Sequence, residues 1–276
     1  MASLQRSIED FRSEGWVLVG QSEPLPELRL DVALLPGLVG DAPSVFAVVD
    51  VLRASTSIVT LLERGVPAVI PAAGVDQARA LRKRLPGHHL LCGEQAGLAP
   101  PGFDYGNSPA EFAAAAFDGR PAILATSNGT RILSDLAEAP AVLVGALVNR
   151  EAAARALLAL AAAHGCGATI VCAAAPGGRS IALEDALGAG AIAEAALRLD
   201  PTTVRPTDAA LLARDAFLAN VPDLRAALAS ARHGAELIAT GFAADIDYCA
   251  RLDASTTVPL LHRDEKGLPA LRPYPA

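Results

Sequence analysis

The chain has 276 residues, of which 52% are hydrophobic and 19% charged, and its formal net charge at pH 7 is −7. This composition is typical of a folded globular protein and excludes a disordered chain. Only two lysines are present, which argues against a nucleic-acid-binding surface, because such a surface needs clustered basic groups. No apolar run reaches the roughly 18 residues that would span a bilayer, and the N-terminus lacks the apolar segment of a secretory signal. We therefore expect a cytoplasmic protein that binds neither nucleic acid nor a membrane.

Short apolar runs alternate with helical patterns from residue 28 to about residue 250. In chain order, the predicted strands are 28–34, 44–51, 67–71, 88–92, 121–125, 141–145 and 167–173. The predicted helices are 55–64, 75–85, 108–117, 129–138, 149–164, 183–199, 207–219, 222–231 and 243–251. Strands that alternate with helices of this length indicate βαβ units and a mainly parallel sheet.

These elements predict a single α/β domain over residues 28–261. The part of it that begins near residue 183 is almost entirely helical and is expected to pack over the sheet. Residues 256–261 are expected to return as an edge strand. Residues 1–27 are interpreted as an N-terminal arm with weak periodicity. The proline-rich residues 262–276 are predicted to be an irregular tail.

Three of the predicted strands end in a short polar loop that leads into a helix. These segments are VFAVVDVLRASTS (45–57), AILATSNGT (122–130) and TIVCAAAPGGRS (169–180). Helix N-termini bind phosphate because their first N–H groups are unpaired and the helix dipole is positive there. Loops at the carboxyl ends of strands in an open α/β sheet meet at one crevice. The three loops therefore predict a site for a small, multiply charged anion.

The first loop contains a carboxylate at the end of an otherwise apolar run. Burying Asp50 is costly unless it is paired, hydrogen-bonded or bound to a metal. Pairing with Arg53 would be a purely structural explanation, and a catalytic or metal-binding role is the alternative that we favour. A helix N-cap needs only one hydroxyl, so Ser55, Thr56 and Ser57 beside an arginine predict an anion-binding loop.

A long loop over residues 93–107 carries a second group of polar residues, and long loops within compact domains are usually functional. Glu94 and Asp104 offer hard oxygen ligands suited to Mg²⁺, and Asn107 lies at the end of the loop. Ser108, followed by a proline, is predicted to be a helix N-cap.

The other two loops add further candidates. Asn128, Gly129 and Thr130 lie between a predicted strand and a helix, although Asn-Gly is also a common turn. Arg179 belongs to the third loop, and the helix after it begins with Glu184 and Asp185. Acidic residues in a first helical turn are ordinary partners of the helix dipole. A metal ligand or a general acid or base is the alternative role for these two carboxylates.

Seven segments occur together in one order: DVLRAST (50–56), GE (93–94), GFDYGNSP (102–109), SNGT (127–130), the pair Gly145 and Asn149, LED with the later AG (183–190), and DIDYCARLD (245–253). This order resembles the 2-phosphosulfolactate phosphatase (ComB-like) family over residues 29–261. Alanines in CAAAPGGRS stand where a glycine after the cysteine is more usual in the family.

The resemblance implies a Mg²⁺-dependent acid phosphatase with a three-layer α/β/α fold. Family members hydrolyse 2-phosphosulfolactate to sulfolactate and phosphate, a step on the route to coenzyme M. The family's motifs place Asp50, Arg53, Glu94 and Asp185 as catalytic residues. Metal-ligand candidates are Asp50, Glu94, Asp104, Glu184 and Asp185. Candidates for binding the substrate are Arg53, Ser55, Thr56, Ser57, Asn107, Ser108, Asn128, Gly129, Thr130 and Arg179.

We expect water to attack the phosphoryl group, activated by the metal or by a carboxylate, and a phospho-aspartate on Asp50 is the second route. Asn128, Thr130 and Arg179 would orient the carboxylate and sulfonate. Two other functions remain open: a phosphatase for a different small phosphorylated hydroxy acid, and a non-catalytic protein that senses an anion. The small anionic substrate is the expected partner, and the sequence leaves a homodimer open.

Overall fold

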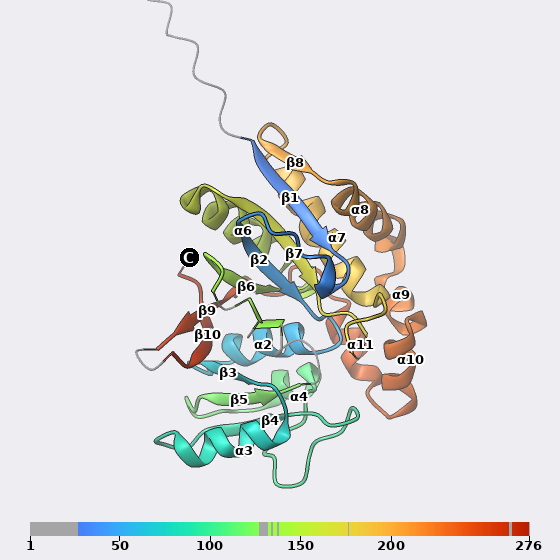
Figure 1. Ribbon diagram of the computed structural model, residues 1–276. Helices are drawn as coiled ribbons and strands as arrows, with labels where there is room; N and C mark the ends of the chain where they lie inside the picture. Colours follow the sequence, from blue (N-terminus) through green and yellow to red (C-terminus); the bar gives the residue numbers. More distant parts are fainter. Residues whose placement is uncertain are drawn as a thin grey trace, which may run out of the picture.

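The computed structural model describes residues 27–126, 132–133, 135–136, 138–175, 177–264 and 267–275 (Figure 1). The strands are β1 (Leu28–Ala33), β2 (Ser44–Val49), β3 (Val69–Ala72), β4 (Leu90–Gly93), β5 (Ala122–Ala125), β6 (Val142–Gly145), β7 (Gly167–Cys172), β8 (Val204–Pro206), β9 (Pro259–Arg263) and β10 (Pro269–Pro273). The helices are α2 (Ala54–Glu63), α3 (Val75–Arg84), α4 (Pro109–Ala114), α6 (Arg150–His164), α7 (Leu183–Leu199), α8 (Asp208–Asn220), α9 (Leu224–Ser230), α10 (Arg232–Ala239) and α11 (Ala243–Cys249).

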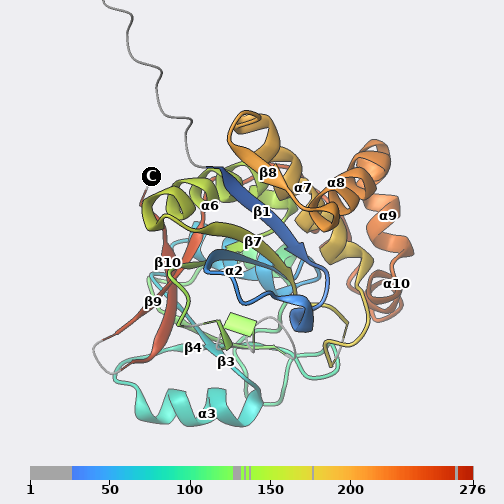
Figure 2. The same cartoon turned by 45° about the horizontal axis from the view of Figure 1, so that its top comes forward.

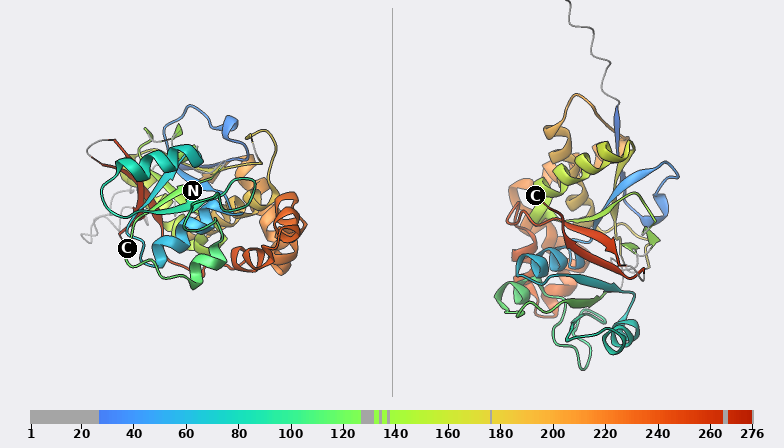
Figure 3. Two further views of the ribbon diagram at one scale, coloured as in Figure 1. Left: turned by 90° about the horizontal axis from the view of Figure 1, so that it is seen from below. Right: turned by 90° about the vertical axis from the view of Figure 1, so that its left-hand side faces the viewer.

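Ten strands of the described chain form one mixed sheet in the order β4-β5-β3-β10-β9-β6-β2-β7-β1-β8. The strands β4, β5 and β3 pair in parallel, and so do β6, β2, β7, β1 and β8. The antiparallel hairpin of β9 and β10 lies between these two parallel groups (Figures 1 and 3). The predicted α/β fold with a mixed central sheet is confirmed.

The C-terminal hairpin corrects two expectations. Residues 256–261 were expected as an edge strand and residues 262–276 as an irregular tail, whereas β9 and β10 lie in the middle of the sheet. The prolines of this segment stand at the first or last position of a strand, at Pro259, Pro269 and Pro273. Proline is tolerated at such positions because few ladder hydrogen bonds are lost there. A proline-rich sequence was therefore compatible with two strands.

Helices cover both faces of the sheet, which gives the three-layer arrangement. Alternate residues of β2 point to opposite faces, so Val45 and Ala47 join a core with α6, α7 and α8, whereas Phe46 and Val48 join a core with α2. All six residues of β2 are buried, as expected for a parallel strand that is covered on both sides. Helix α3 covers β3, β4 and β5 (Figure 2).

Most predicted elements between residues 28 and 173 match the structure within a few residues. Besides β10, the short strand β8 and the helix α10 were missed. The helix expected at 222–231 is divided into a 3₁₀ turn (Val221–Asp223) and α9. The helix expected at 129–138 begins outside the described residues and is not assessed. None of the described helices is long and apolar enough to cross a membrane.

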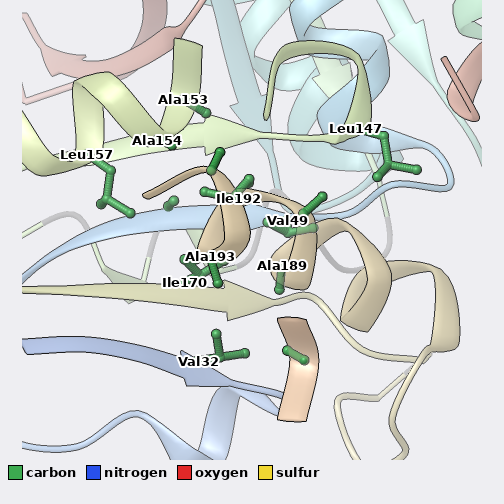
Figure 4. Close-up of a cluster of buried hydrophobic side chains, with 14 of the residues drawn as sticks. Val32, Val49, Leu147, Ala153, Ala154, Leu157, Ile170, Ala189, Ile192 and Ala193 are labelled. Carbon is green, nitrogen blue, oxygen red and sulfur yellow. The ribbon is translucent and has the colours of Figure 1, made fainter. Parts of the chain in front are cut away.

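Helix α7 is built from small residues and lies close to both the sheet and α8. Figure 4 shows its residues Ala189, Ile192 and Ala193 in the core that also contains Val49 and Ile170. A Cβ atom on Gly188 would lie 2.5 Å from a methyl group of Val51, and one on Gly190 would lie 2.0 Å from the carbonyl oxygen of Ala213. The two glycines therefore allow α7 to approach its neighbours closely.

We expect Gly190→Ala to lower the free energy of unfolding by about 1–3 kcal/mol, because the new methyl group would overlap the α8 backbone. Urea unfolding followed by circular dichroism measures this change. Gly40→Ala is the matched control, because nothing lies within 4 Å of a Cβ at Gly40. Equal stability of Gly190→Ala and the wild type would contradict the packing described here.

Candidate functional site

A cavity of about 620 Å³ opens where strands from both parallel groups end. Its wall contains residues that directly follow β2, β4, β5 and β7 at their carboxyl ends: Asp50, Arg53, Glu94, Thr126 and Ala174. The sequence predicted that loops at the carboxyl ends of strands would meet at one crevice. All three predicted segments contribute to this wall, the second through Thr126.

Three helices begin at the cavity. The N-cap residues of α2, α7 and α10 are Arg53, Ala182 and Ala231, and all three line the wall. None of these three N-cap side chains accepts a capping hydrogen bond. The first N–H groups of a helix and its positive dipole end stabilise a nearby anion. The cavity is thus suited to a ligand with more than one negative charge.

Arg53 is buried, with an exposed fraction of 3%, and is held in place from several sides. Its Nη1 donates to Oδ2 of Asp245 at 2.8 Å, and its Nη2 donates to the carbonyl oxygen of Gly97 at 2.9 Å. The ring of Phe242 lies 4.5 Å from the guanidinium carbon. A guanidinium has five N–H donors, so the two bonds leave donors available on a group that is already oriented at the cavity wall.

Asp245 is in turn fixed by the segment that begins α4. The hydroxyl of Ser108 donates to Oδ1 of Asp245 at 2.6 Å, and the backbone N–H of Ala110 donates to the same oxygen at 3.2 Å. Ser108 also accepts from the backbone N–H of Glu111 at 3.2 Å, which confirms its predicted N-cap role. Ser108 therefore acts on the cavity through Asp245 and Arg53.

Three carboxyl groups gather at the start of α2 and α7. Oδ1 of Asp185 accepts from the backbone N–H of Val51 at 2.9 Å, and Oδ2 accepts from that of Ala174 at 3.0 Å. Burial and the neighbouring Asp50 and Glu184 hold the pKa of Asp185 well above its ordinary value. Burial, together with Asp50, also raises the pKa of Glu184. These groups disfavour one another's negative charge, and a cation or a proton at this point would relieve the repulsion.

The hydroxyls after Arg53 are directed into the protein. Ser55 accepts from the backbone N–H of Asp50 at 2.8 Å and donates to the carbonyl of Val48 at 3.3 Å. The hydroxyl of Thr56 donates to the carbonyl of Val51, and that of Ser57 to the carbonyl of Asn107. All three are buried, and none of them is on the cavity wall. They shape the turn between β2 and α2.

Of the polar residues predicted for the site in the long loop after β4, two line the cavity and one lies outside it. Glu94 lines the cavity, and its Oε2 accepts from the backbone N–H of Gly97 at 2.8 Å. Asp104 does not line it, because its Oδ2 accepts from Arg82 at 2.7 Å and from the backbone N–H of Leu91 at 2.8 Å. Asn107 lines the cavity with an exposed fraction of 4%, and its Oδ1 is buried without a hydrogen-bond partner in the described structure.

The remaining predicted residues lie elsewhere. Asn128, Gly129 and Thr130 are outside the described residues. Arg179 is exposed and does not belong to the cavity wall. The wall instead includes Arg232 and His233 at the start of α10, which sequence reasoning missed because no helix was predicted there.

Among the residues that the structure describes, no group of three or more His, Cys, Asp and Glu side chains has an arrangement that could hold a metal ion. Mg²⁺, however, is commonly bound by one or two carboxylates together with water and substrate phosphate. Asp50 and Glu94 supply such carboxylates. Asn107 lies on the same wall, and its buried Oδ1, which has no hydrogen-bond partner in the described structure, would offer a further hard oxygen donor. This donor set fits a magnesium ion bound jointly with a phosphorylated ligand.

We expect Asp245→Asn to lower the free energy of unfolding by about 3–5 kcal/mol, because it leaves the buried guanidinium of Arg53 without its counter-ion. Thermal and urea unfolding measure this loss. Asp247→Asn is the control, because the Asp247–Arg225 pair is exposed and such pairs contribute about 0–1 kcal/mol. Similar losses in both variants would contradict the role given to Asp245.

We expect Glu184→Gln to stabilise the protein at about pH 8 more than at about pH 4. The raised pKa means that the folded state binds this proton more tightly than the unfolded chain, so stability falls as the pH rises from the ordinary carboxyl pKa toward the raised one. The glutamine removes this loss. Unfolding temperatures in EDTA at the two pH values test the sign, with exposed Glu63→Gln as the control. A gain that is equal at both pH values would contradict it.

Comparison with known proteins shows the family of this chain. The family model described as 2-phosphosulpholactate phosphatase matches residues 35–264. A probable 2-phosphosulfolactate phosphatase of Deinococcus radiodurans is 40% identical over 235 residues, which cover 85% of this chain and 93% of that protein. A protein with the same description from Carboxydothermus hydrogenoformans is 34% identical over 239 residues, which cover 86% and 95%. The chain therefore belongs to the 2-phosphosulfolactate phosphatase family of phosphoric monoester hydrolases.

Proposed function

We propose that the protein hydrolyses 2-phosphosulfolactate to sulfolactate and inorganic phosphate, with Mg²⁺ as its cofactor. The observation that carries this proposal is the meeting of three helix N-termini, a fixed arginine and several carboxylates in one cavity. A substrate with phosphate, carboxylate and sulfonate groups requires several positive positions and a cation at the phosphate. This reaction would be the step on the route to coenzyme M that the family resemblance implies. We propose that it takes place in the cytoplasm.

The phosphoryl group would lie against Arg53 and the start of α2. Negative charge develops on its oxygens as the ester bond breaks, and oriented N–H donors stabilise that charge. Arg53 is suited to this task because Asp245, Gly97 and Phe242 already fix its guanidinium. Little reorganisation is then needed when the substrate binds.

The carboxylates would divide two tasks between them. Asp50, Glu94 and the amide oxygen of Asn107 would hold the magnesium ion, which when bound neutralises phosphoryl oxygens and activates water. Glu184 would accept the proton of the attacking water, and its raised pKa supports this assignment because a general base works best with a pKa near the working pH. The water oxygen would bond to phosphorus as the bond between phosphorus and the ester oxygen breaks. The ester oxygen would take up a proton from solvent, which gives sulfolactate and phosphate.

A phosphatase for a larger phosphorylated hydroxy acid is the second candidate. The cavity of about 620 Å³ lies within the range of sites that hold drug-sized ligands, which is more room than a three-carbon acid requires. Activity on a longer phosphorylated acid that exceeds activity on 2-phosphosulfolactate would favour this candidate.

Phosphate release from racemic 2-phosphosulfolactate, 2-phospholactate and phosphoglycolate tests the proposal, with Mg²⁺ or with EDTA. We expect turnover that requires Mg²⁺ and is fastest with the sulfonate ester. Asp50→Asn should reduce kcat at least about 100-fold, as is usual when a charged group at the reacting centre is lost. Asp76→Asn is the control, because the Asp76 side chain is fully exposed on α3. Full activity of Asp50→Asn, or turnover that survives EDTA, would contradict this mechanism.

A further inference from the structure

We propose that Arg232 and His233, with the N-terminal turn of α10, form a second anion subsite that binds the acid group of the substrate remote from its phosphate. This inference rests on the proposed function and assigns the carboxylate or sulfonate end of the substrate to residues that no sequence motif indicated. Its ligand class is an organic phosphate with an additional acid group.

The position of α10 is set by a tight crossing with α9. A Cβ atom on Gly234 would lie 1.9 Å from the carbonyl oxygen of Leu228, so only glycine permits this approach. The chain passes from α9 to α10 at Ala231, which is buried and lines the cavity. The first turn of α10 is thereby held at the wall, where its unpaired N–H groups and positive dipole end favour an anion.

The side chain of Arg232 adds positive charge on the same side. Arg232 forms no ion pair with any described residue, so its charge remains available to a ligand. Nδ1 of His233 lies 3.6 Å from Oε2 of Glu236, and both residues line the cavity. Ser230, the last residue of α9, lies next to this turn on the cavity wall, and its hydroxyl donates to the carbonyl oxygen of Ala227.

The charges of the cavity indicate two separate anion positions. Glu184 interacts electrostatically with Arg232 and His233 and also with Asp50. The positive charge of Arg53 lies at the start of α2, next to Asp50, whereas that of Arg232 lies on α10. Two cationic groups on different elements, with carboxylates between them, match a ligand that has two acid groups and a metal-bound phosphate.

The unpartnered amide oxygen of Asn107, which the proposed function assigns to the metal ion at the phosphate, indicates that a ligand completes this cavity. A buried acceptor without a hydrogen bond carries a free-energy cost, and such groups in folded proteins normally find a partner. Asn107 lies on the same wall as Arg53 and Arg232. A bound ligand, or an ion bound with it, would supply the missing partner.

The test compares two substrates in Arg232→Gln, His233→Gln and the double variant. We expect kcat/KM for 2-phosphosulfolactate, relative to that for 4-nitrophenyl phosphate, to fall about tenfold or more in the double variant, mainly through KM, because charge-assisted hydrogen bonds to one substrate are lost. Arg232→Lys should restore part of this ratio. Arg225→Gln is the control, because Arg225 pairs with Asp247 outside the cavity wall, and its ratio should equal that of the wild type.

An unchanged ratio in the double variant would overturn the proposal, and so would an equal loss with both substrates, which would place these residues at the phosphate. Calorimetric titration with sulfolactate, which has no phosphate, separates this proposal from the proposed function. If the wild type hydrolysed neither ester, the proposed function would fail. Weaker sulfolactate binding by the double variant would still support the subsite, and no sulfolactate binding by the wild type would overturn it.

Discussion

The cavity depends on the close approach of α7 to the ends of β2 and β7. Alanine and glycine dominate the buried residues of this helix, and its packing leaves no room for larger side chains at Gly188 and Gly190. The approach brings the first turn of α7 to the loops that follow the two strands. There, each oxygen of Asp185 accepts a backbone N–H from one of the loops. One carboxylate thus joins α7 to the loop after β7 and to the loop after β2, which is 134 residues away.

The same arrangement pairs some of the buried charges and brings others of like sign together. Arg53 and Asp245 neutralise each other in the protein interior, which avoids the large cost of an isolated buried ion. The carboxyl groups of Asp50, Glu184 and Asp185 carry charge of the same sign and cannot neutralise one another. Burial raises the pKa of Glu184 and of Asp185. The folded protein therefore retains unfavourable electrostatic energy at the cavity, where substrate and cation would bind.

The sequence predicted the alternation of strands and helices well because burial on both faces of a parallel sheet produces uninterrupted apolar runs such as that of β2. It also predicted that Asp50, Arg53 and Glu94 would meet, since each follows a strand at its carboxyl end. It did not predict the partner of Arg53, because Asp245 is 192 residues away and only tertiary packing brings them together. The conformation of the alanine-rich third loop was also not predictable from the sequence. Ala174 adopts a left-handed conformation with φ of 65°, which glycine would adopt without strain, and its N–H is held by Asp185.

The central position of the β9–β10 hairpin affects how the chain can fold. The two parallel groups of strands are joined through residues 259–273, which pair with β6 on one side and β3 on the other. During synthesis, both groups emerge from the ribosome before the hairpin that connects them. Contacts between residues so distant in sequence form slowly. Until they form, the unpaired strand edges can pair with other chains and aggregate. Completion of this sheet therefore waits for the hairpin, and β3 and β6 remain open edges until it pairs with them.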